Sequence, residues 1–312
     1  MSEALPPDVA AGFQAADDGV VDAVTLGDLP ATVPTPTELD GPTGAQRIAA
    51  VFDQCRAQRR AALIVYLPAG FPDMATSQAC LEAAAAAGAD LLEVGFPFSD
   101  PMMDGPTIQA ANQVALDHGY GVPDDLLMCS LLTAATHVPA VAMTYYTIPD
   151  ARGLEWFAEG IQAAGLAGAI LPDLPANEAA PWLDQARLRG LATIFLASSV
   201  SSDARLAAIA DVSGGWVYAA GLLGVTGVKA VDDSETRDLV ARIRKHTTLP
   251  VAVGLGVRTA DQAGLVAAYA DGVIVGSAAV TAVADGPIES APQRVAGFVR
   301  ELRRGIDAAA RA

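Results

Sequence analysis

Short, almost continuous runs of apolar residues recur along the chain from residue 61 onward. Eight such runs occur, at residues 61–68, 89–96, 138–146, 168–173, 191–198, 215–221, 249–256 and 271–277. Strands that are covered on both faces are apolar along their whole length, so these runs are typical of a parallel sheet. The segments between them have helical patterning, and alternating strands and helices predict an α/β fold.

The helical segments have recognisable ends. A helix that precedes the first apolar run is expected to begin near Ala45. Residues 75–87 and 154–164 are alanine-rich, and each is followed by a glycine, which commonly ends a helix. Thr259 and Gln262 have the spacing of a capping box at a further helix start. The interval between the second and third runs is long enough for two helices.

Eight strand–helix units in about 250 residues predict a (β/α)₈ TIM barrel rather than a doubly wound sheet. No G-x-G-x-x-G follows the first run, which disfavours a dinucleotide-binding fold. We assign the barrel domain to residues 45–312. Residues 1–44 lack hydrophobic periodicity, and we expect them to form a mostly disordered acidic extension.

The charge distribution narrows the classes of function. The formal net charge is −17, and residues 1–45 contain eight acidic and no basic residues. No basic patch with interleaved aromatic residues occurs, which disfavours nucleic-acid binding. Neither a secretory signal nor an apolar stretch of about 18 residues is found, so we expect no membrane span. Cys55, Cys80 and Cys129 have no metal or redox spacing and are expected to be reduced thiols in a cytoplasmic protein.

Glu93 is a carboxylate inside the apolar run 89–96. Because side chains alternate along a strand, Leu91 and Glu93 face the barrel interior if Leu92 and Val94 face the helices. Glu93 would then lie at the mouth of the barrel, where partial desolvation raises the pKa of a carboxyl group toward neutrality. The alternative is an ordinary buried glutamate paired with an arginine, and spacing alone does not separate the two.

Two aspartates follow the same run, in the segment SDPMMDGPT. Asp104 lies on the loop that can fold over the mouth, although Asp-Gly-Pro is also ordinary turn chemistry. Asp100 precedes a proline and is expected to have a structural role in starting the turn. Asp104 is therefore the second candidate carboxylate.

Glycines close three adjacent strands of the predicted barrel. They are Gly224 and Gly227 after the sixth run, Gly254 and Gly256 in the seventh, and Gly276, followed by Ser277, in the eighth. Backbone N–H groups at helix N-termini bind phosphate without basic side chains, and barrels often place a phosphate after strands seven and eight. One GxG pattern is a weak signal, but three glycine-bearing loops on neighbouring strand ends predict a phosphate site.

Several catalytic chemistries are disfavoured by the residues available. A Schiff-base lyase needs a lysine in the barrel, but Lys229 is expected on a loop and Lys245 in a helix. His118, His137 and His246 are expected at the surface rather than as metal ligands. No P-loop, nucleophile elbow or H-E-x-x-H motif is found. The chemistry that remains is acid/base catalysis by carboxylates on a phosphorylated substrate, without a bound cofactor.

The most specific string of the chain is EVGFPFSDPMMDGPTIQAAN at residues 93–112, and YLPAGFPD, LPDLP, VYAAGLLGVTG, VGLGV and VGSA accompany it. Through these segments, residues 46–305 resemble the tryptophan synthase alpha subunit family. The resemblance implies a lyase of tryptophan biosynthesis. Its reaction would be the retro-aldol cleavage of indole-3-glycerol phosphate to indole and glyceraldehyde 3-phosphate.

The resemblance also implies roles for single residues. Glu93 matches an acid/base glutamate, and Asp104 matches an aspartate that pairs with the indole N–H. Tyr218 matches a site tyrosine with a supporting role, although core packing would also account for it. The remaining matches are the phosphate-binding Gly227, Gly256, Gly276 and Ser277, the loop-closing Thr226, and Tyr66, Tyr145 and Ile170, which either line the indole pocket or fill the barrel.

A partner protein is implied as well. The family acts with a beta subunit that carries pyridoxal phosphate, in an assembly of two alpha and two beta subunits, and this chain itself is expected to bind neither that cofactor nor a metal. The loops after the second and third runs are expected to face the partner. Two alternatives stay open: a stand-alone lyase that releases free indole, and a non-catalytic barrel that binds a phosphorylated ligand.

The chain departs from the family pattern at four positions. They are Phe71 in place of an aspartate, Thr147 in place of an asparagine, Gly221 in place of a serine and Leu222 in place of an arginine. These changes fall in the loops after the first, third and sixth runs. Loop closure and partner contact are the properties that they are expected to affect.

Overall fold

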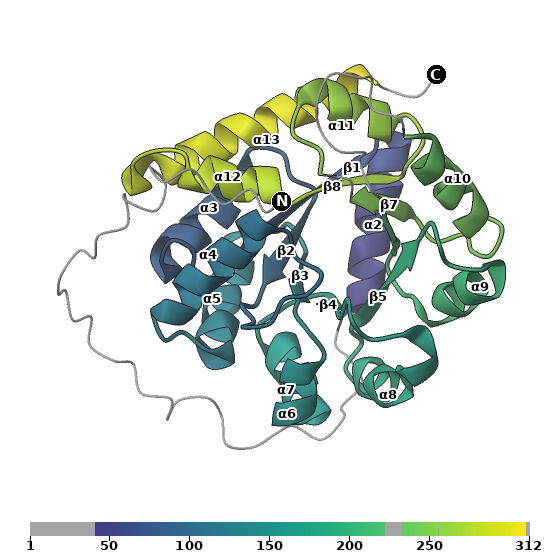
Figure 1. Cartoon of the computed structure of the whole chain (residues 1–312), viewed down its shortest axis with the longest axis horizontal. Helices are drawn as coiled ribbons and strands as arrows, with labels where there is room; N and C mark the ends of the chain where they lie inside the picture. Colours follow the sequence, from purple (N-terminus) through teal and green to yellow (C-terminus); the bar gives the residue numbers. More distant parts are fainter. Residues whose placement is uncertain (1–40, 222–232, 255, 310–312) are drawn as a thin grey trace.

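The computed structural model describes residues 41–221, 233–254 and 256–309. Eight parallel strands close into a barrel in the order of the sequence, as predicted (Figure 1). They are β1 (Ala62–Pro68), β2 (Leu91–Gly95), β3 (Ala140–Met143), β4 (Gly168–Ile170), β5 (Ala192–Ser198), β6 (Val217–Ala220), β7 (Val251–Gly254) and β8 (Gly272–Val275). Each strand lies inside one apolar run and is shorter than the run.

Helices surround the barrel and connect successive strands. In the described residues they are α2 (Gly44–Ala57), α3 (Met74–Ala86), α4 (Pro106–Asp117), α5 (Val122–Ala135), α6 (Thr147–Arg152), α7 (Leu154–Ala163), α8 (Ala180–Leu188), α9 (Asp203–Val212), α10 (Ser234–Ile243), α11 (Ala260–Ala267), α12 (Ser277–Ala284) and α13 (Ala291–Ala308), with the short 3-10 helices η1 (Ala176–Glu178) and η2 (Ile288–Ser290). Two helices, α4 and α5, lie between β2 and β3, as the length of that interval predicted.

The helix ends follow the local chemistry of the sequence. Gly88 and Gly165 have positive φ angles of 112° and 75°, which glycine adopts without steric cost, and they follow α3 and α7. At α11 the Thr259 side chain accepts from the Gln262 N–H, as predicted. The Gln262 side chain, however, accepts from the Arg258 N–H rather than the Thr259 N–H, so the predicted reciprocal capping box is only half formed.

The apolar residues form two layers. One layer lies between the strands and the outer helices and includes Leu92 and Val94. The other fills the barrel and includes Leu91, Val141 and Ile170. The alternation predicted for β2 is therefore confirmed, since Leu91 points inward whereas Leu92 and Val94 point to the helices.

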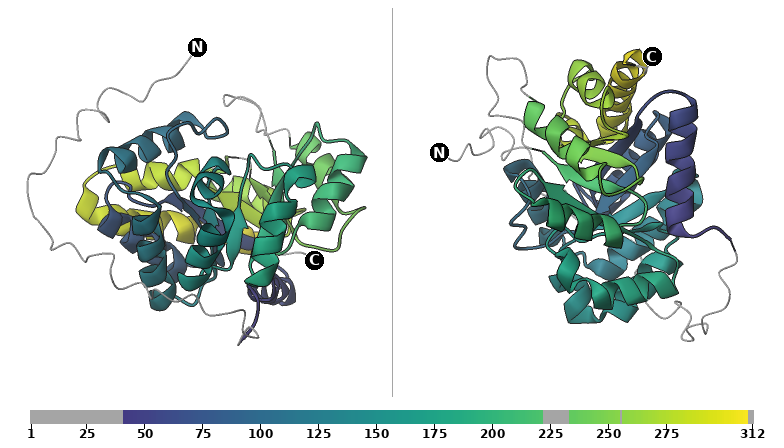
Figure 2. Two further views of the ribbon diagram at one scale, coloured as in Figure 1. Left: turned by 90° about the horizontal axis from the view of Figure 1, so that it is seen from below. Right: turned by 90° about the vertical axis from the view of Figure 1, so that its right-hand side faces the viewer.

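Helix α2 closes one end of the barrel. Its Ile48, Phe52 and Cys55 side chains belong to the same interior cluster as the inward residues of the strands. Its first residue, Gly44, donates its N–H to Gly190 O at 2.7 Å, close to the amino end of β5. Figure 2 shows the helix lying across the barrel at this end. We call this end the N-terminal face and the opposite end the mouth.

Several expectations fall on residues that the structure does not describe. They concern most of the acidic extension (residues 1–40) and the loop after β6, with Leu222, Gly224, Thr226, Gly227 and Lys229. In the described part, no helix has the length and apolar character needed to cross a membrane.

Candidate active site

Glu93 is the central residue of β2 and lies beside Tyr66 of β1 and Val141 of β3. Its side chain is 1% exposed, and neither carboxylate oxygen has a hydrogen-bond partner in the structure. Burial raises the pKa of Glu93 from its ordinary value of 4.5 to about 8. The alternative of a glutamate paired with an arginine does not describe this side chain.

Two tyrosines share the interior with Glu93. Tyr66 is buried and Tyr218 half-buried, and desolvation together with the charges of Asp104 and Glu93 raises the pKa of both hydroxyl groups. The glycines that end β2 and β7 leave room for these hydroxyls. A side chain at Gly95 would collide with Tyr66 Oη, and a Cβ at Gly254 would lie 2.5 Å from Tyr218 Oη. These strand ends are therefore shaped around two phenol groups and one carboxyl group.

Asp104 lies on the loop between β2 and α4, half-buried, and its carboxylate takes no part in capping α4. The turn is made by its neighbours, because Gly105 is the N-cap and Pro106 the first residue of the helix. Asp104 Oδ2 instead accepts from Asn112 Nδ2 at 3.4 Å. The turn interpretation thus accounts for Gly105 and Pro106 but not for the Asp104 side chain.

Tyr145, just after β3, holds the Asp104 loop in place. Its hydroxyl accepts from the Met103 N–H at 2.9 Å, and its ring stacks on Phe98 with centroids 5.1 Å apart. Burial raises the pKa of Asp104 to about 6, while hydrogen bonds from the Tyr145 hydroxyl and the Asn112 amide oppose the rise. Side chains from the segment after β3 and from α4 therefore lower the pKa of a carboxyl group on the loop between β2 and α4.

The two carboxyl groups are unequal in acidity. With pKa values of about 8 for Glu93 and about 6 for Asp104, Glu93 is mostly protonated and Asp104 mostly ionised at pH 7. Environments that separate the pKa values of two neighbouring carboxyl groups are typical of acid/base sites. The arrangement can offer a proton donor and an anion at the same time.

Of the glycines predicted to bind phosphate, the described Gly256 and Gly276 lie at the same end of the barrel. Gly276 is the N-cap of α12, and Ser277 is the first residue of that helix. Gly256 follows β7 with φ 69° and is exposed. Tyr66 Cδ1 lies 3.4 Å from a Cβ built at Gly276, so this strand end adjoins the tyrosine beside Glu93. Gly227 and Thr226 lie outside the described residues.

Ile170 is fully buried in the interior cluster, next to inward residues of the other strands. Its placement agrees with either predicted role, lining a pocket or filling the barrel. Tyr66 and Tyr145 are also buried, at 5% and 6% exposure. The hydroxyl of Tyr145 has the additional contact with the Asp104 loop, which the sequence did not predict.

The departures from the family pattern have local structural explanations where they are described. Phe71 is buried in the layer between strands and helices, where an aspartate would be desolvated. Thr147 begins α6, a helix of six residues that the apolar pattern did not predict. Gly221 donates its N–H to Gly254 O at 3.1 Å and so continues the pairing of β6 with β7.

Of the residues considered for other chemistries, Lys245 and the three histidines are described, and Lys229 lies outside the described residues. Lys245 lies in the turn after α10 rather than in the helix, which corrects the expectation for it. His118 and His137 are exposed as predicted, and His246 is half-buried in the same turn as Lys245. Within the described ranges, no three His, Cys, Asp or Glu residues are grouped so that they could hold a metal ion.

Asn112 is the main site residue that the sequence did not single out. It is 3% exposed, and its Oδ1 has no hydrogen-bond partner in the structure, although its amide nitrogen binds Asp104. A buried unpaired carbonyl costs about 1–3 kcal/mol, so its retention calls for an explanation. The sequence feature that could have identified Asn112 is a side-chain amide at an inward position of the helix that directly follows the Asp104 loop.

Comparisons with known proteins identify the family of the chain. The family model described as "Tryptophan synthase alpha chain" matches residues 52–307. The tryptophan synthase alpha chain of Streptomyces avermitilis is 46% identical over 252 residues, which are 80% of this chain and 91% of that protein. The corresponding chain of Mycobacterium tuberculosis is 46% identical over 262 residues, which are 84% of this chain and 95% of that protein.

The fold agrees as well. A crystal structure of tryptophan synthase from M. tuberculosis, in an open form with BRD0059 bound, matches with a TM-score of 0.77 and 43% identity. The match covers 84% of this chain and 98% of that chain. Given a family model that spans most of the barrel, relatives of this identity and the shared fold, the chain belongs to the tryptophan synthase alpha chain family.

Proposed function

We propose that this chain cleaves indole-3-glycerol phosphate to indole and glyceraldehyde 3-phosphate by general acid/base catalysis with Glu93 and Asp104. The observation that carries the proposal is the pair of unequal carboxyl groups at the mouth. Glu93 is buried without a partner, with its pKa at about 8, and Asp104 is half-buried with its pKa at about 6. Membership of the tryptophan synthase alpha chain family supports the choice of substrate.

The neutral form of Glu93 is suited to the first proton transfer. Its carboxyl group gives a proton to C3 of the indole ring, and the ring becomes positively charged. Asp104, as the anion, accepts a hydrogen bond from the indole N–H and stabilises that charge. Fixed charges in a site that excludes water act more strongly than in solution, which is why a buried donor beside an ionised acceptor favours this step.

The second transfer restores the starting state. The Glu93 carboxylate takes the proton of the hydroxyl group next to the ring. As the hydroxyl becomes a carbonyl, the bond between C3 and the side chain breaks and its electron pair returns to the ring. Indole and an aldehyde are released, and Glu93 is protonated again. Tyr218 keeps its proton because its pKa is raised, so we assign it a supporting hydrogen bond and no proton transfer.

Tyr145 and Asn112 position Asp104 for this role. The Tyr145 hydroxyl binds the backbone at Met103, and both side chains donate to the Asp104 carboxylate. These donors favour the ionised form of Asp104 at a half-buried position, where desolvation alone would oppose it. We therefore describe Tyr145 and Asn112 as positioning residues.

The substrate phosphate is proposed to bind backbone groups at the ends of β7 and β8. Gly276 and Ser277 begin α12, and helix N-termini attract anions. Gly256 follows β7 with a positive φ angle that brings backbone rather than a side chain toward the site. Gly227 and Thr226 are proposed to complete the phosphate site and the loop closure.

The pH dependence of the reaction tests the assignment. Activity requires ionised Asp104, so it is lost as the pH falls below about 6, and it requires protonated Glu93, so it is lost as the pH rises above about 8. Indole release measured from pH 5 to 9 should therefore give a bell-shaped curve with a maximum near pH 7. A flat profile across this range would argue against paired carboxyl catalysis.

We also propose that the chain works with a pyridoxal-phosphate-carrying beta subunit, in a cytoplasmic assembly of two alpha and two beta subunits. Met102 and Met103 on the loop after β2 are 89% and 54% exposed, as expected of apolar residues that a partner covers. Co-purification with a beta subunit and indole release with and without it test this. Fast release without any partner would favour the stand-alone lyase, and binding without product in both conditions would favour a non-catalytic barrel.

A further inference from the structure

The loop after β4 brings a carboxylate to the segment that follows β3. The loop begins with a turn in which the Leu174 N–H donates to Leu171 O at 3.1 Å, and Asp173 lies inside this turn with an exposed side chain. Asp173 Oδ1 accepts from the Tyr146 N–H at 2.8 Å. Because β3 and β4 are paired neighbours, this bond fixes the segments that leave them relative to one another at the mouth.

The residue that donates this bond is the chain neighbour of Tyr145. Tyr146 is the N-cap of α6, and Tyr145 O accepts from the Ile148 N–H at 3.0 Å in the first turn of that helix. The Tyr145 hydroxyl in turn accepts from the Met103 N–H at 2.9 Å. The backbone at these two tyrosines therefore determines where the phenol meets the Asp104 loop.

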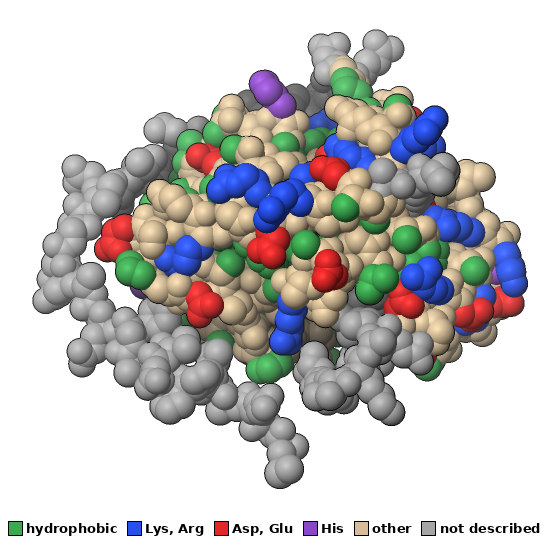
Figure 3. Space-filling view, turned by 90° about the horizontal axis from the view of Figure 1, so that it is seen from above, with side chains coloured by type: hydrophobic (Ala, Val, Ile, Leu, Met, Phe, Trp, Pro, Cys, Tyr) green, Lys and Arg blue, Asp and Glu red, His purple; other side chains and the backbone are tan. Residues whose placement is uncertain are grey.

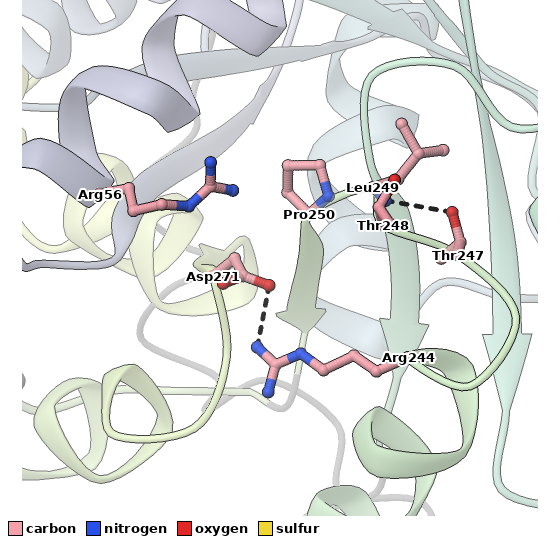
Figure 4. A pocket seen from close by; sticks show the side chains of 7 residues that line it. All are labelled: Arg56, Arg244, Thr247, Thr248, Leu249, Pro250 and Asp271. Atoms are coloured by element: carbon pink, nitrogen blue, oxygen red, sulfur yellow. Dashed lines mark hydrogen bonds and ion pairs between the residues drawn. The ribbon is translucent and has the colours of Figure 1, made fainter.

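Asp173 and Asp271 show two ways in which a loop carboxylate holds a backbone N–H. At the N-terminal face, Asp271 Oδ2 accepts from the Val251 N–H at 3.0 Å and pairs with Arg244 at 2.9 Å, beside a cavity of about 400 Å³ (Figure 4). Asp173 forms no ion pair with a described residue, although Arg205 lines the same cavity of about 240 Å³. The charge of Asp173 is therefore left to act on groups at the mouth.

Asp173 also differs from the charged side chains of the outer surface. Over α13 and α11, acidic and basic side chains lie interspersed (Figure 3), and on α13 itself Arg303 pairs with Asp307 at 3.0 Å. Between α9 and α10, Asp203 pairs with Arg242 at 2.9 Å. These contacts join charge to charge, whereas Asp173 binds the backbone next to a residue of the proposed site.

The charge of Asp173 acts on the Tyr145 hydroxyl. Desolvation raises the pKa of Tyr145 to about 12, and the charges of Asp104 and Asp173 add to the rise. The hydroxyl therefore keeps its proton and donates to the Asp104 carboxylate, which lowers the pKa of Asp104. The other titratable groups that interact with the charge of Asp104 are Tyr66 and Tyr218, on β1 and β6.

We propose that Asp173 is a positioning residue for Asp104 and acts through the two tyrosines after β3. The inference rests on the proposed function, in which Asp104 is the anion. The hydrogen bond from the Tyr146 N–H holds the backbone after β3, and this backbone places the Tyr145 hydroxyl. The hydroxyl holds the loop after β2 through the Met103 N–H and donates to the Asp104 carboxylate.

Asp173→Ala removes the acceptor and tests this chain of contacts. Without a firmly placed Tyr145 hydroxyl, the pKa of Asp104 should rise above its value of about 6. NMR of chains labelled at the aspartate carboxyl carbon measures that titration, and the resonance missing from Asp104→Asn identifies it.

The same variant should slow the reaction. We expect kcat for indole release to fall about tenfold, the factor that one hydrogen bond to a charged group contributes. The acid limb of the pH–rate profile should move to higher pH together with the pKa of Asp104. KM should change less, because the proposed phosphate contacts lie at the ends of β7 and β8. Rates are compared at saturating beta subunit, so that a weakened partner contact does not imitate the effect.

Two further variants are matched controls. Asp173→Asn keeps an oxygen that can accept from the Tyr146 N–H, so it should leave both the titration and the rate nearly unchanged. Asp150→Ala removes an exposed carboxylate from the first turn of α6 and should also change neither. The replaced side chains are exposed, so circular dichroism should report an unaltered fold in each variant.

Tyr145→Phe separates the chain of contacts from a general disturbance of the mouth. Loss of the hydroxyl should by itself raise the pKa of Asp104. Asp173→Ala added to Tyr145→Phe should then have no further effect on that pKa, because both changes break the same chain.

The proposal is overturned if the Asp104 titration is unchanged in Asp173→Ala, or if the effects of Asp173→Ala and Tyr145→Phe add. It also fails if Asp173→Asn is as slow as Asp173→Ala, because the charge and not the hydrogen bond would then act. Normal indole release by Asp104→Asn would instead refute the proposed function. The NMR titration would still decide whether Asp173 and Tyr145 act on Asp104.

Discussion

Asp90 and Glu93 are three residues apart in the sequence, Asp90 directly before β2 at its amino end and Glu93 in the middle of the strand. Asp90, just before β2, binds Arg60 through two contacts of 2.7 and 2.8 Å, Arg303 at 2.9 Å and the Leu63 N–H at 2.8 Å. Glu93 is more deeply buried and has no hydrogen-bond partner in the structure. One carboxylate is fully paired, and the other is left free.

The difference shows that two carboxylates of one strand region can serve different purposes, one in stabilising the fold and the other in chemistry. At the N-terminal face, Asp90 ties the segment after α2 and helix α13 to the barrel through its ion pairs with Arg60 and Arg303. At the mouth, burial without a cation keeps Glu93 protonated near neutral pH, which a proton donor needs. The absence of a compensating charge is what makes Glu93 a candidate catalyst.

Burial alone does not make a site. Asp125 on α5 is 2% exposed, its Oδ1 has no partner in the structure, and burial raises its pKa well above the ordinary value. It lies on an outer helix, however, beside Cys129 and away from the barrel interior. Glu93 differs because tyrosines and a second carboxylate share its surroundings.

Glu93→Gln tests the chemical half of the comparison and should have the largest effect. Removing a general acid/base group lowers the rate by about 10²- to 10⁴-fold, and the amide preserves the shape of the side chain. Indole release from indole-3-glycerol phosphate measures the loss. A rate within a few-fold of the unmodified chain would show that Glu93 is no more catalytic than Asp90.

Asp90→Asn tests the structural half. It leaves Arg60 without its carboxylate and Arg303 with Asp307 alone, and breaking a largely buried pair of this kind lowers the free energy of unfolding by about 3 kcal/mol. Urea denaturation measures the change, while activity per folded molecule should remain. Asp53→Asn, at an exposed pair on the same face, is the control and should change stability by less than about 0.5 kcal/mol.

The pH dependence of stability separates the two carboxylates in a second way. Between about pH 5.5 and 7, folded Glu93 keeps a proton that the unfolded chain releases, so rising pH lowers the free energy of unfolding by ~1.4 kcal/mol per pH unit. Glu93→Gln lacks this penalty. Its stability relative to the unmodified chain should therefore rise by about 2 kcal/mol across this range, in urea melts at both pH values. A constant difference would mean that Glu93 is ionised in the folded state.

Asn112→Ala should have the smallest effect and sharpens the role of the loop after β2. Loss of the amide donor costs about tenfold in rate, as for a hydrogen bond worth about 1.4 kcal/mol to a charged group. It also raises the pKa of Asp104, so the acid limb of the pH–rate profile moves to higher pH. Gln113→Ala, on the exposed side of the same helix, should change neither. An unshifted acid limb in Asn112→Ala would make Asn112 a packing residue only.

Much of the fold follows from the sequence because the determining signals are local. The apolar runs predict every strand, and Gly88 and Gly165 predict two helix ends. The strands are shorter than the runs because apolar residues at one or both ends of each run belong to the neighbouring turns and loops. α6 was not predicted, because Pro149 suggests a loop, yet proline is tolerated in the first turn of a helix.

The site was predictable in its carboxylates but not in their environment. Glu93 is a charged residue in an otherwise apolar strand, so it can be identified from the sequence alone. The contact of Tyr145 with Met103 joins residues 42 positions apart, and the packing of α2 against the barrel joins elements that no local pattern relates. Whether Glu93 had an arginine partner likewise depended on distant residues, and only the fold decides it.

Because α2 closes the N-terminal face, it also limits the routes by which a small molecule can leave the barrel. Ile48 and Phe52 fill the barrel opening at the N-terminal face. The next layer toward the mouth, with Leu91 and Ile170, is fully buried. A small apolar product formed beside Glu93 therefore cannot leave through the N-terminal face. Its route out is through the mouth, at the carboxyl ends of the strands.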